Sequence, residues 1–245
     1  MKTVQVRNIT LGEGRPKICV PIVGQTKDDI LLEAGTFARI PVDVVEWRVD
    51  WFEDVFDTDK VLDVAKDLQT VLKDTPILFT FRTAKEGGEK AISHEAYKAL
   101  NMAVAKSGYV DLIDVEAFTG EEIVKSMIQE AHSYGVKVIA SNHDFDATPE
   151  KDEIVRRLRM MQDYGADIPK MAVIAKKQTG RAYTLKCHAG NVRAVRRPPD
   201  HYHVHGRYRC CQPSRRETFG SALTFGAATK LRTGTDQCQR ACTGS

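Results

Sequence analysis

The feature that most constrains the fold is a sixfold alternation of short apolar runs with longer amphipathic stretches across residues 17–175. The apolar runs are rich in β-branched residues, whereas the stretches between them repeat apolar residues at helical spacing. Six strands separated by single helices indicate parallel β-α units. The expected strands are 17–24, 42–52, 76–82, 110–118, 136–145 and 168–175, and the expected helices are 28–40, 57–74, 94–108, 121–135 and 150–165.

The favoured topology is an α/β fold of the (β/α)8 TIM-barrel type, with residues 1–245 as one domain. Barrels of this kind commonly run to about 250 residues. A doubly wound open sheet is the alternative. It is less favoured because the sequence has no nucleotide-binding glycine motif. A composition of 42% hydrophobic and 28% charged residues excludes disordered, collagen-like and disulfide-miniprotein classes.

The sequence gives no sign of a membrane partner. No apolar stretch approaches the roughly 18 residues that span a bilayer. The first residues, MKTVQVRNITLGEG, lack the apolar segment of a secretory signal. We therefore expect a cytoplasmic protein.

Polar residues follow the expected strands where a barrel enzyme needs them, because catalytic groups of such barrels lie at the carboxyl ends of the strands. These positions hold Glu46, Arg48, Arg82, Glu86, Asp114, Glu116, Asn142, His143, Asp144 and Lys170. Burying a charge costs several kcal/mol unless it is paired. We therefore expect Glu46 to pair with Arg48, and Arg82 to pair with Asp114.

Lys170 and His143 follow successive strands and stand among apolar residues. A single histidine after a strand is ordinarily structural, and a single lysine there is ordinarily an exposed strand-end charge. A desolvated lysine beside other cations, however, becomes a nucleophile toward carbonyl carbons, and a nearby histidine can move protons at neutral pH. Together with Arg82 and Glu86, the two residues indicate a barrel enzyme that acts through a Schiff base.

Five segments carry a resemblance to a known family. They are EWRVD (46–50), FTFRTAKEGG (79–88), DLIDVE (111–116), SNHDF (141–145) and ADIPKMAV (166–173). In this order and spacing they closely resemble type I 3-dehydroquinate dehydratase. The resemblance runs from Met1 to about Thr179 and resumes at residues 217–230.

The resemblance implies a lyase of the shikimate pathway, which leads to aromatic amino acids. Such an enzyme dehydrates 3-dehydroquinate to 3-dehydroshikimate with no metal and no organic cofactor. The resemblance further implies that two copies of the chain form a homodimer. The expected binding partner is the small-molecule substrate, and no nucleic acid is expected to bind.

The resemblance also assigns roles to individual residues. Lys170 forms an imine with the substrate ketone. His143 takes the α-proton, donates a proton to the departing hydroxyl, and assists formation and hydrolysis of the imine. Glu86 matches the carboxylate that orients this histidine. The substrate-binding positions that match the family are Glu46, Arg48 and Arg82.

The last part of the chain differs in charge from the rest. Residues 1–175 hold 22 Lys and Arg against 30 Asp and Glu, a net charge of −8. Residues 176–245 hold 14 against 3, a net charge of +11, together with five of the six cysteines and four of the seven histidines.

Between residues 180 and 216 the resemblance is lost. The family pattern there is a helix, barrel strand seven and a loop whose arginine binds the substrate carboxylate, but Pro213 stands at the arginine position. After Lys230 the family carries a lid with a serine and a glutamine, where this chain has Arg232 and Asp236.

A shifted reading frame accounts for both departures. For each pair of neighbouring residues, the last two bases of the first codon and the first base of the second codon form a codon of the shifted frame. Read in this way, 180–216 permits a helix, a strand PIITMSM and the loop arginine, and 231–245 permits a lid reading SAPGQ. We infer that both segments are out-of-frame translations, and that a protein with the written segments would fold poorly and be nearly inactive.

Other interpretations of this part of the chain are weaker. His201, His203 and His205 with Cys210 and Cys211 match no standard structural zinc spacing. An arginine-rich segment can bind nucleic acid, and disulfides are disfavoured in the cytosol. The alternatives for the whole chain are an inactive barrel with an adventitious basic Cys/His-rich tail, or another Schiff-base lyase or aldolase.

Overall fold

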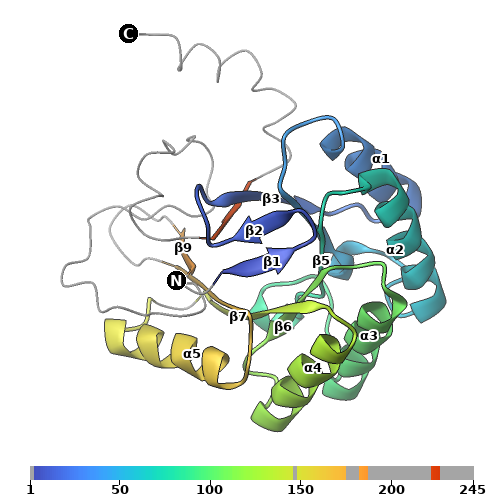
Figure 1. The fold of residues 1–245 in the computed structure, drawn as a ribbon. Coiled ribbons are helices and arrows are strands. Elements are labelled where there is room, and N and C mark those ends of the chain that lie inside the picture. The colour runs from blue at the N-terminus through green and yellow to red at the C-terminus, as the bar shows by residue number, and fades with distance from the viewer. Residues whose placement is uncertain (1–2, 146–147, 175–181, 187–221, 227–245) are drawn as a thin grey trace, which may run out of the picture.

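The computed structural model of the chain describes residues 3–145, 148–174 and 222–226, and the backbone of 182–186 (Figure 1). The strands are β1 (Val4–Val6), β2 (Ile9–Leu11), β3 (Lys17–Ile22), β4 (Val44–Arg48), β5 (Ile77–Thr80), β6 (Leu112–Glu116), β7 (Lys137–Asp144), β8 (Ile168–Ile174), β9 (Ala182–Lys186) and β10 (Leu223–Phe225). The helices are α1 (Lys27–Phe37), α2 (Thr58–Leu72), α3 (His94–Ser107), α4 (Glu121–Ser133) and α5 (Lys151–Asp163), with short 3-10 turns η1 (Val49–Trp51) and η2 (Ala84–Glu86). All six strands and five helices expected over residues 17–175 are confirmed.

Three of the helices begin at residues that cap their first backbone N–H groups. The side chains of Thr26, Asp57 and Ser93 accept hydrogen bonds from backbone N–H groups in the first turns of α1, α2 and α3. Each helix then buries one apolar face against the sheet, as its periodicity predicts.

The sheet has the strand order of a barrel. Its order is β10-β3-β4-β5-β6-β7-β8-β9, so β3 to β8 lie side by side in chain order. Seven of the strands are parallel, and β10, far along the chain, pairs with β3. A doubly wound sheet reverses its order at a switch point, and this sheet does not. Figure 1 shows the helices ranged around the outside of the curled sheet.

The edge strand β9 is the exception, because it pairs antiparallel with β8. Only residues 175–181 separate the two strands, which is too few for the crossover of about a dozen residues that a parallel pair needs. Ala182–Lys186 thus forms a strand where the family pattern has a helix, within the segment in which the resemblance is lost. The other parts of 180–216, and all of 231–245, lie outside the described residues.

The strands alternate between two apolar environments. Outward side chains such as Trp47 and Phe79 pack against the helices in the main core, and the two rings meet edge to face at 5.6 Å between centroids. Inward side chains near the strand beginnings pack with the β1–β2 hairpin, which covers that end of the sheet (Figure 1). Among the residues described, no helix is both long and apolar enough to cross a membrane.

Candidate active site

The inward face of the sheet changes from apolar to polar within one two-residue step. Near the strand beginnings, the inward residues that pack with the hairpin include Val44, Leu78, Leu112, Ile139 and Ile168. Two residues further along the same strands stand Glu46, Thr80, Asp114, Ser141 and Lys170, all of them buried. Successive residues of a strand point to opposite faces, so these five side chains form one polar layer inside the curled sheet.

Lys170 lies in this layer and is only 6% exposed. Its Nζ donates a hydrogen bond to Asp114 Oδ2 at 3.2 Å and lies 4.0 Å from Glu46 Oε1. The same nitrogen lies over the ring of Phe225, 4.5 Å from its centroid. The amine is therefore held inside the sheet by two carboxylates and an aromatic face.

Arg82 ties three strands together beneath the site. Its guanidinium lies 2.9 Å from Asp114 Oδ1 and 2.9 Å from Glu116 Oε1, and donates to Ser141 Oγ at 3.0 Å. The expected Arg82–Asp114 pair is confirmed. Burial alone acts to lower the pKa of the guanidinium, but the facing carboxylates outweigh it and raise that pKa.

Asp114 is ionised despite complete burial. Desolvation acts to raise the pKa of its carboxyl group, but Arg82 and Lys170 reverse this effect and hold the pKa below its usual value. The carboxylate therefore remains a charged partner for Lys170 at neutral pH.

The expected pair between Glu46 and Arg48 is wrong. Arg48 instead makes two hydrogen bonds of 2.8 Å to the carboxylate of Asp50, which the η1 turn places opposite the guanidinium plane. Such forked pairing suits the guanidinium geometry. Glu46 is engaged elsewhere, since Thr80 Oγ1 donates to Glu46 Oε1 at 3.0 Å.

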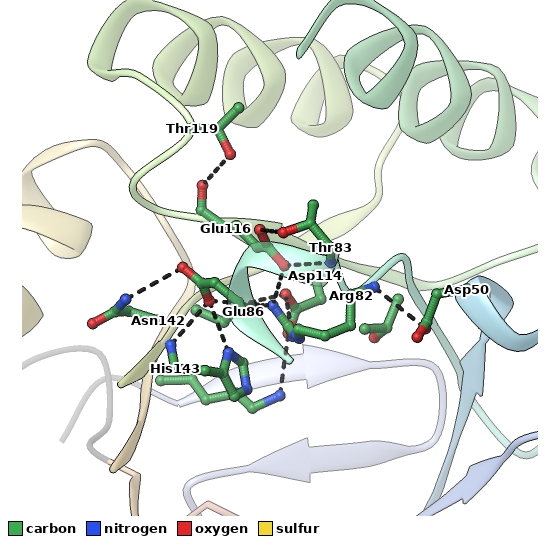
Figure 2. A network of polar contacts seen from close by, with 12 residues as sticks. Asp50, Arg82, Thr83, Glu86, Asp114, Glu116, Thr119, Asn142 and His143 are labelled. Carbon is green, nitrogen blue, oxygen red and sulfur yellow. Dashed lines mark hydrogen bonds and ion pairs between the residues drawn. The ribbon is translucent and has the colours of Figure 1, made fainter. Parts of the chain in front are cut away.

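Glu86 contacts His143, which lies two residues beyond the polar layer, toward the end of β7 (Figure 2). Glu86 Oε2 lies 2.9 Å from His143 Nδ1 and also accepts the backbone N–H of His143 at 2.9 Å. Glu86 Oε1 accepts from Asn142 Nδ2 at 3.3 Å. A carboxylate at Nδ1 favours the neutral tautomer protonated there, which leaves the lone pair on Nε2.

The pKa of Glu86 is raised from 4.5 to about 7. Burial is the largest cause, and the nearby carboxylate of Glu116 adds to it, while Arg82, Asn142 and the His143 amide act in the opposite direction. Groups poised near neutrality in a buried site are typical of proton-transfer machinery.

The structure brings the six sequence-predicted site residues to the carboxyl end of one sheet. Lys170 and Ser141 are partners across β8 and β7, and His143 follows two residues later on the same face as Ser141. Three buried contributors were not predicted. Period-two counting back from Arg82 and His143 could have identified Thr80 and Ser141, whereas Asp50 lies in a short turn without a periodic signal.

This sheet and this set of side chains define an α/β-barrel enzyme with a buried lysine beside a histidine–carboxylate pair. A family model described as type I 3-dehydroquinase matches residues 18–189, and the chain belongs to this family. The match runs ten residues past Thr179, into the segment where the resemblance read from the sequence is interrupted.

Named relatives agree with this assignment. The chain is 47% identical over 230 residues to 3-dehydroquinate dehydratase of Bacillus licheniformis, covering 94% of this chain and 90% of the relative. It is 49% identical to the Listeria monocytogenes serotype 4a protein of the same name, covering 94% and 91%.

Solved structures share the fold. The type I 3-dehydroquinate dehydratase of Clostridium difficile, described with covalent modified comenic acid, has a TM-score of 0.77 and 39% identity, covering 94% of this chain and 90% of its own. The Enterococcus faecalis 3-dehydroquinate dehydratase has a TM-score of 0.77 and 38% identity, covering 94% and 96%.

Proposed function

We propose that the chain is a hydro-lyase that dehydrates 3-dehydroquinate to 3-dehydroshikimate through an imine on Lys170. The observation that carries this proposal is the buried amine of Lys170 on β8, beside the β7 strand whose His143 is held by Glu86. The activity named for the relatives supports the same reaction, and the Clostridium difficile enzyme described with covalent modified comenic acid is consistent with covalent chemistry in this family.

The reaction begins with covalent attachment of the substrate. The amine of Lys170 adds to the ketone carbon of 3-dehydroquinate. The carbonyl oxygen leaves as water with two of the three protons of the ammonium form of Lys170, which His143 relays, and the third proton stays on the nitrogen. The protonated imine that results withdraws electrons from the adjacent carbon, whose proton thereby becomes acidic. Lys170 therefore supplies the electron sink of the reaction.

His143 moves the protons of the elimination. Its Nε2 takes the α-proton and leaves an enamine, and it returns a proton to the hydroxyl group on the β-carbon, which departs as water. Hydrolysis of the imine consumes one water and frees both the product and the amine. Glu86 holds the ring in place and stabilises its charged form.

Glu46, Arg48 and Arg82 are proposed to bind the substrate. Glu46 lies near Lys170 Nζ, where it can accept hydrogen bonds from substrate hydroxyls. The guanidinium of Arg48 is held by Asp50, and its side chain is partly exposed, so it remains accessible to a substrate. Arg82 adds positive charge beneath the substrate. No metal or organic cofactor takes part in these steps.

Reductive trapping of the imine tests the proposal. Borohydride added with 3-dehydroquinate should leave one covalent substrate adduct on the Lys170 peptide, located by mass spectrometry. Lys170→Met should give no adduct and lower kcat by about ten thousandfold or more, as removal of a covalent nucleophile does in other enzymes.

A matched control and a panel of other substrates sharpen this test. Lys137→Met replaces a partly exposed lysine of the neighbouring strand and should leave trapping unchanged. Trapping of an aldolase substrate in place of 3-dehydroquinate would instead support another Schiff-base lyase. Peptide mapping of residues 176–245 accompanies this experiment, because it shows whether the protein carries the printed sequence or that of the shifted frame. A protein with the printed sequence should have a lower turnover.

The assembly and location of the protein are further proposals. We propose a cytoplasmic location, and the family resemblance leads us to propose a homodimer. Sedimentation equilibrium of the full chain measures its mass directly. A mass equal to one chain would contradict the dimer.

A further inference from the structure

Arg157 reaches from helix α5 to the end of β7, where it contacts the side chains on either side of His143. One of its nitrogens, Nη1, donates to Asn142 Oδ1 at 2.9 Å and to Asp144 Oδ2 at 3.1 Å. Its Nε donates to Glu153 Oε1 at 2.7 Å. The guanidinium carbon also lies 5.5 Å from the ring centroid of Phe118.

These contacts fix which way the Asn142 amide faces. A guanidinium is always a donor, so the group that faces it must be the carbonyl oxygen of the amide. The NH2 group of Asn142 then points to the opposite side, where Glu86 Oε1 accepts its hydrogen bond at 3.3 Å. With the amide reversed, its oxygen would face the Glu86 carboxylate and its NH2 group would face Arg157.

We propose that Arg157 is a positioning residue, which holds the Asn142 amide so that Glu86 keeps a hydrogen-bond donor on the oxygen that His143 does not use. The inference rests on the proposed function, because it names what holds the His143–Glu86 pair in place. It adds a chain of contacts from an outer helix to the reacting histidine.

The guanidinium is suited to this task because its own orientation is fixed. Glu153 and Asp144 hold two of its edges, and the ring of Phe118 lies against it. An ammonium group makes no such planar, forked contact. Arg157→Lys should therefore restore only part of the function.

Burial and three neighbours set the charge of Glu86 together with this amide. Arg82 just after β5 and the His143 amide in β7 favour its ionised form, whereas burial and Glu116 in β6 favour the protonated form. Loss of the Asn142 donor removes one group that favours ionisation. The pKa of Glu86 should then rise further, and the pair should lose its charged carboxylate at higher pH than in the unaltered chain.

The test compares Arg157→Met with Arg156→Met in the full chain. Arg156→Met removes the same charge from the same helix. Arg156 also pairs with Glu153, but its side chain is 60% exposed. In Arg157→Met we expect the acidic limb of the kcat–pH profile to move up by about one pH unit. In Arg156→Met the limb should stay in place.

A spectroscopic readout makes the test independent of turnover. In 15N-histidine-labelled protein, with His143 assigned by comparison with His143→Gln, Arg157→Met should shift the ring away from the tautomer protonated at Nδ1. A second variant, Asn142→Leu, removes the donor to Glu86 without adding a charge, and should move both readouts in the same direction. Arg157→Lys decides the matter if Arg157→Met fails to fold, because it should move both readouts by a smaller amount.

Two outcomes overturn the inference. One is an unmoved pH limb and unchanged tautomer in both Arg157→Met and Asn142→Leu. The other is an equal shift in Arg156→Met, which would assign the effect to the charge of the helix. Failure of imine trapping in the unaltered chain would overturn the proposed function instead, while the tautomer of His143 would still decide the inference.

Discussion

Glu86 shows at the scale of one residue how the site opposes stability. Its carboxyl group is protonated in both folded and unfolded chains below about pH 4.5, but between there and pH 7 only the folded chain retains the proton. Stability therefore falls as the pH rises through this window. The whole effect amounts to roughly 3 kcal/mol at most.

Glu86→Gln should remove this pH dependence, because a glutamine has the shape of the protonated group and does not ionise. As the pH rises from 4.5 to 8, the unfolding free energy of the variant should rise relative to that of the unaltered chain by up to about 3 kcal/mol. The variant should also lose activity. Urea unfolding at the two pH values measures the change. Glu122→Gln, an exposed substitution on α4, should give the same small difference at both, and an equally constant difference for Glu86→Gln would refute the expectation.

At this scale, residue type and position in a strand were enough to find Lys170, His143 and Arg82. The partner of Arg48 could not be found in that way. Strand periodicity places Glu46 and Arg48 on one face, but Asp50 is brought opposite the guanidinium by a turn. Arg157 lies in a charge-rich helix, where the sequence suggests only a solvated surface, and the contact with Asn142 appears only when α5 packs against β7.

At the scale of elements, the turn η2 depends on a close backbone approach at Gly88. A Cβ atom there would lie 1.9 Å from the carbonyl oxygen of Arg82. Gly87, just before it, ends the turn with φ of 81°. The two glycines let the chain fold back tightly enough to aim Glu86 at His143.

Gly88→Ala should therefore lower the unfolding free energy by more than about 2 kcal/mol and reduce imine trapping, since the backbone carrying Glu86 must shift. Gly35→Ala is the matched control. That glycine lies within α1 with open space at its Cβ, so the change should stabilise the chain by roughly 0.5–1 kcal/mol. Urea unfolding measures both, and a Gly88→Ala protein as stable as the unaltered chain would count against this account of the turn.

The β1–β2 hairpin was not expected from the sequence. Its two strands have three residues each, too short for a period-two pattern to be recognised. Its turn places Arg7 at φ of 46° rather than the glycine that marks such turns. The hairpin is instead stabilised by burial of Val4, Val6 and Leu11 against the strand beginnings.

For the molecule as a whole, one end of the curled sheet stabilises the fold and the other end holds the candidate active site. The end covered by the hairpin is apolar, and the end that holds Lys170 and His143 is charged. Leu11→Ala, at a side chain 1% exposed, should lower the unfolding free energy by about 2–5 kcal/mol. Below the unfolding transition it should leave kcat within about twofold, because barrels separate stability from catalysis in this way. Urea unfolding and steady-state rates at low temperature measure the two effects, and a large fall in kcat of the folded protein would show that the ends are coupled.

The pairing of β10 with β3 has a consequence for synthesis of the chain. Cys19 and Phe225 are register partners, yet a ribosome adding about 5–20 residues per second needs on the order of 10–40 seconds to pass from one to the other. Throughout that time the free edge of β3 is exposed to other nascent chains, so a cell that makes this protein must protect an unpaired strand before the enzyme exists.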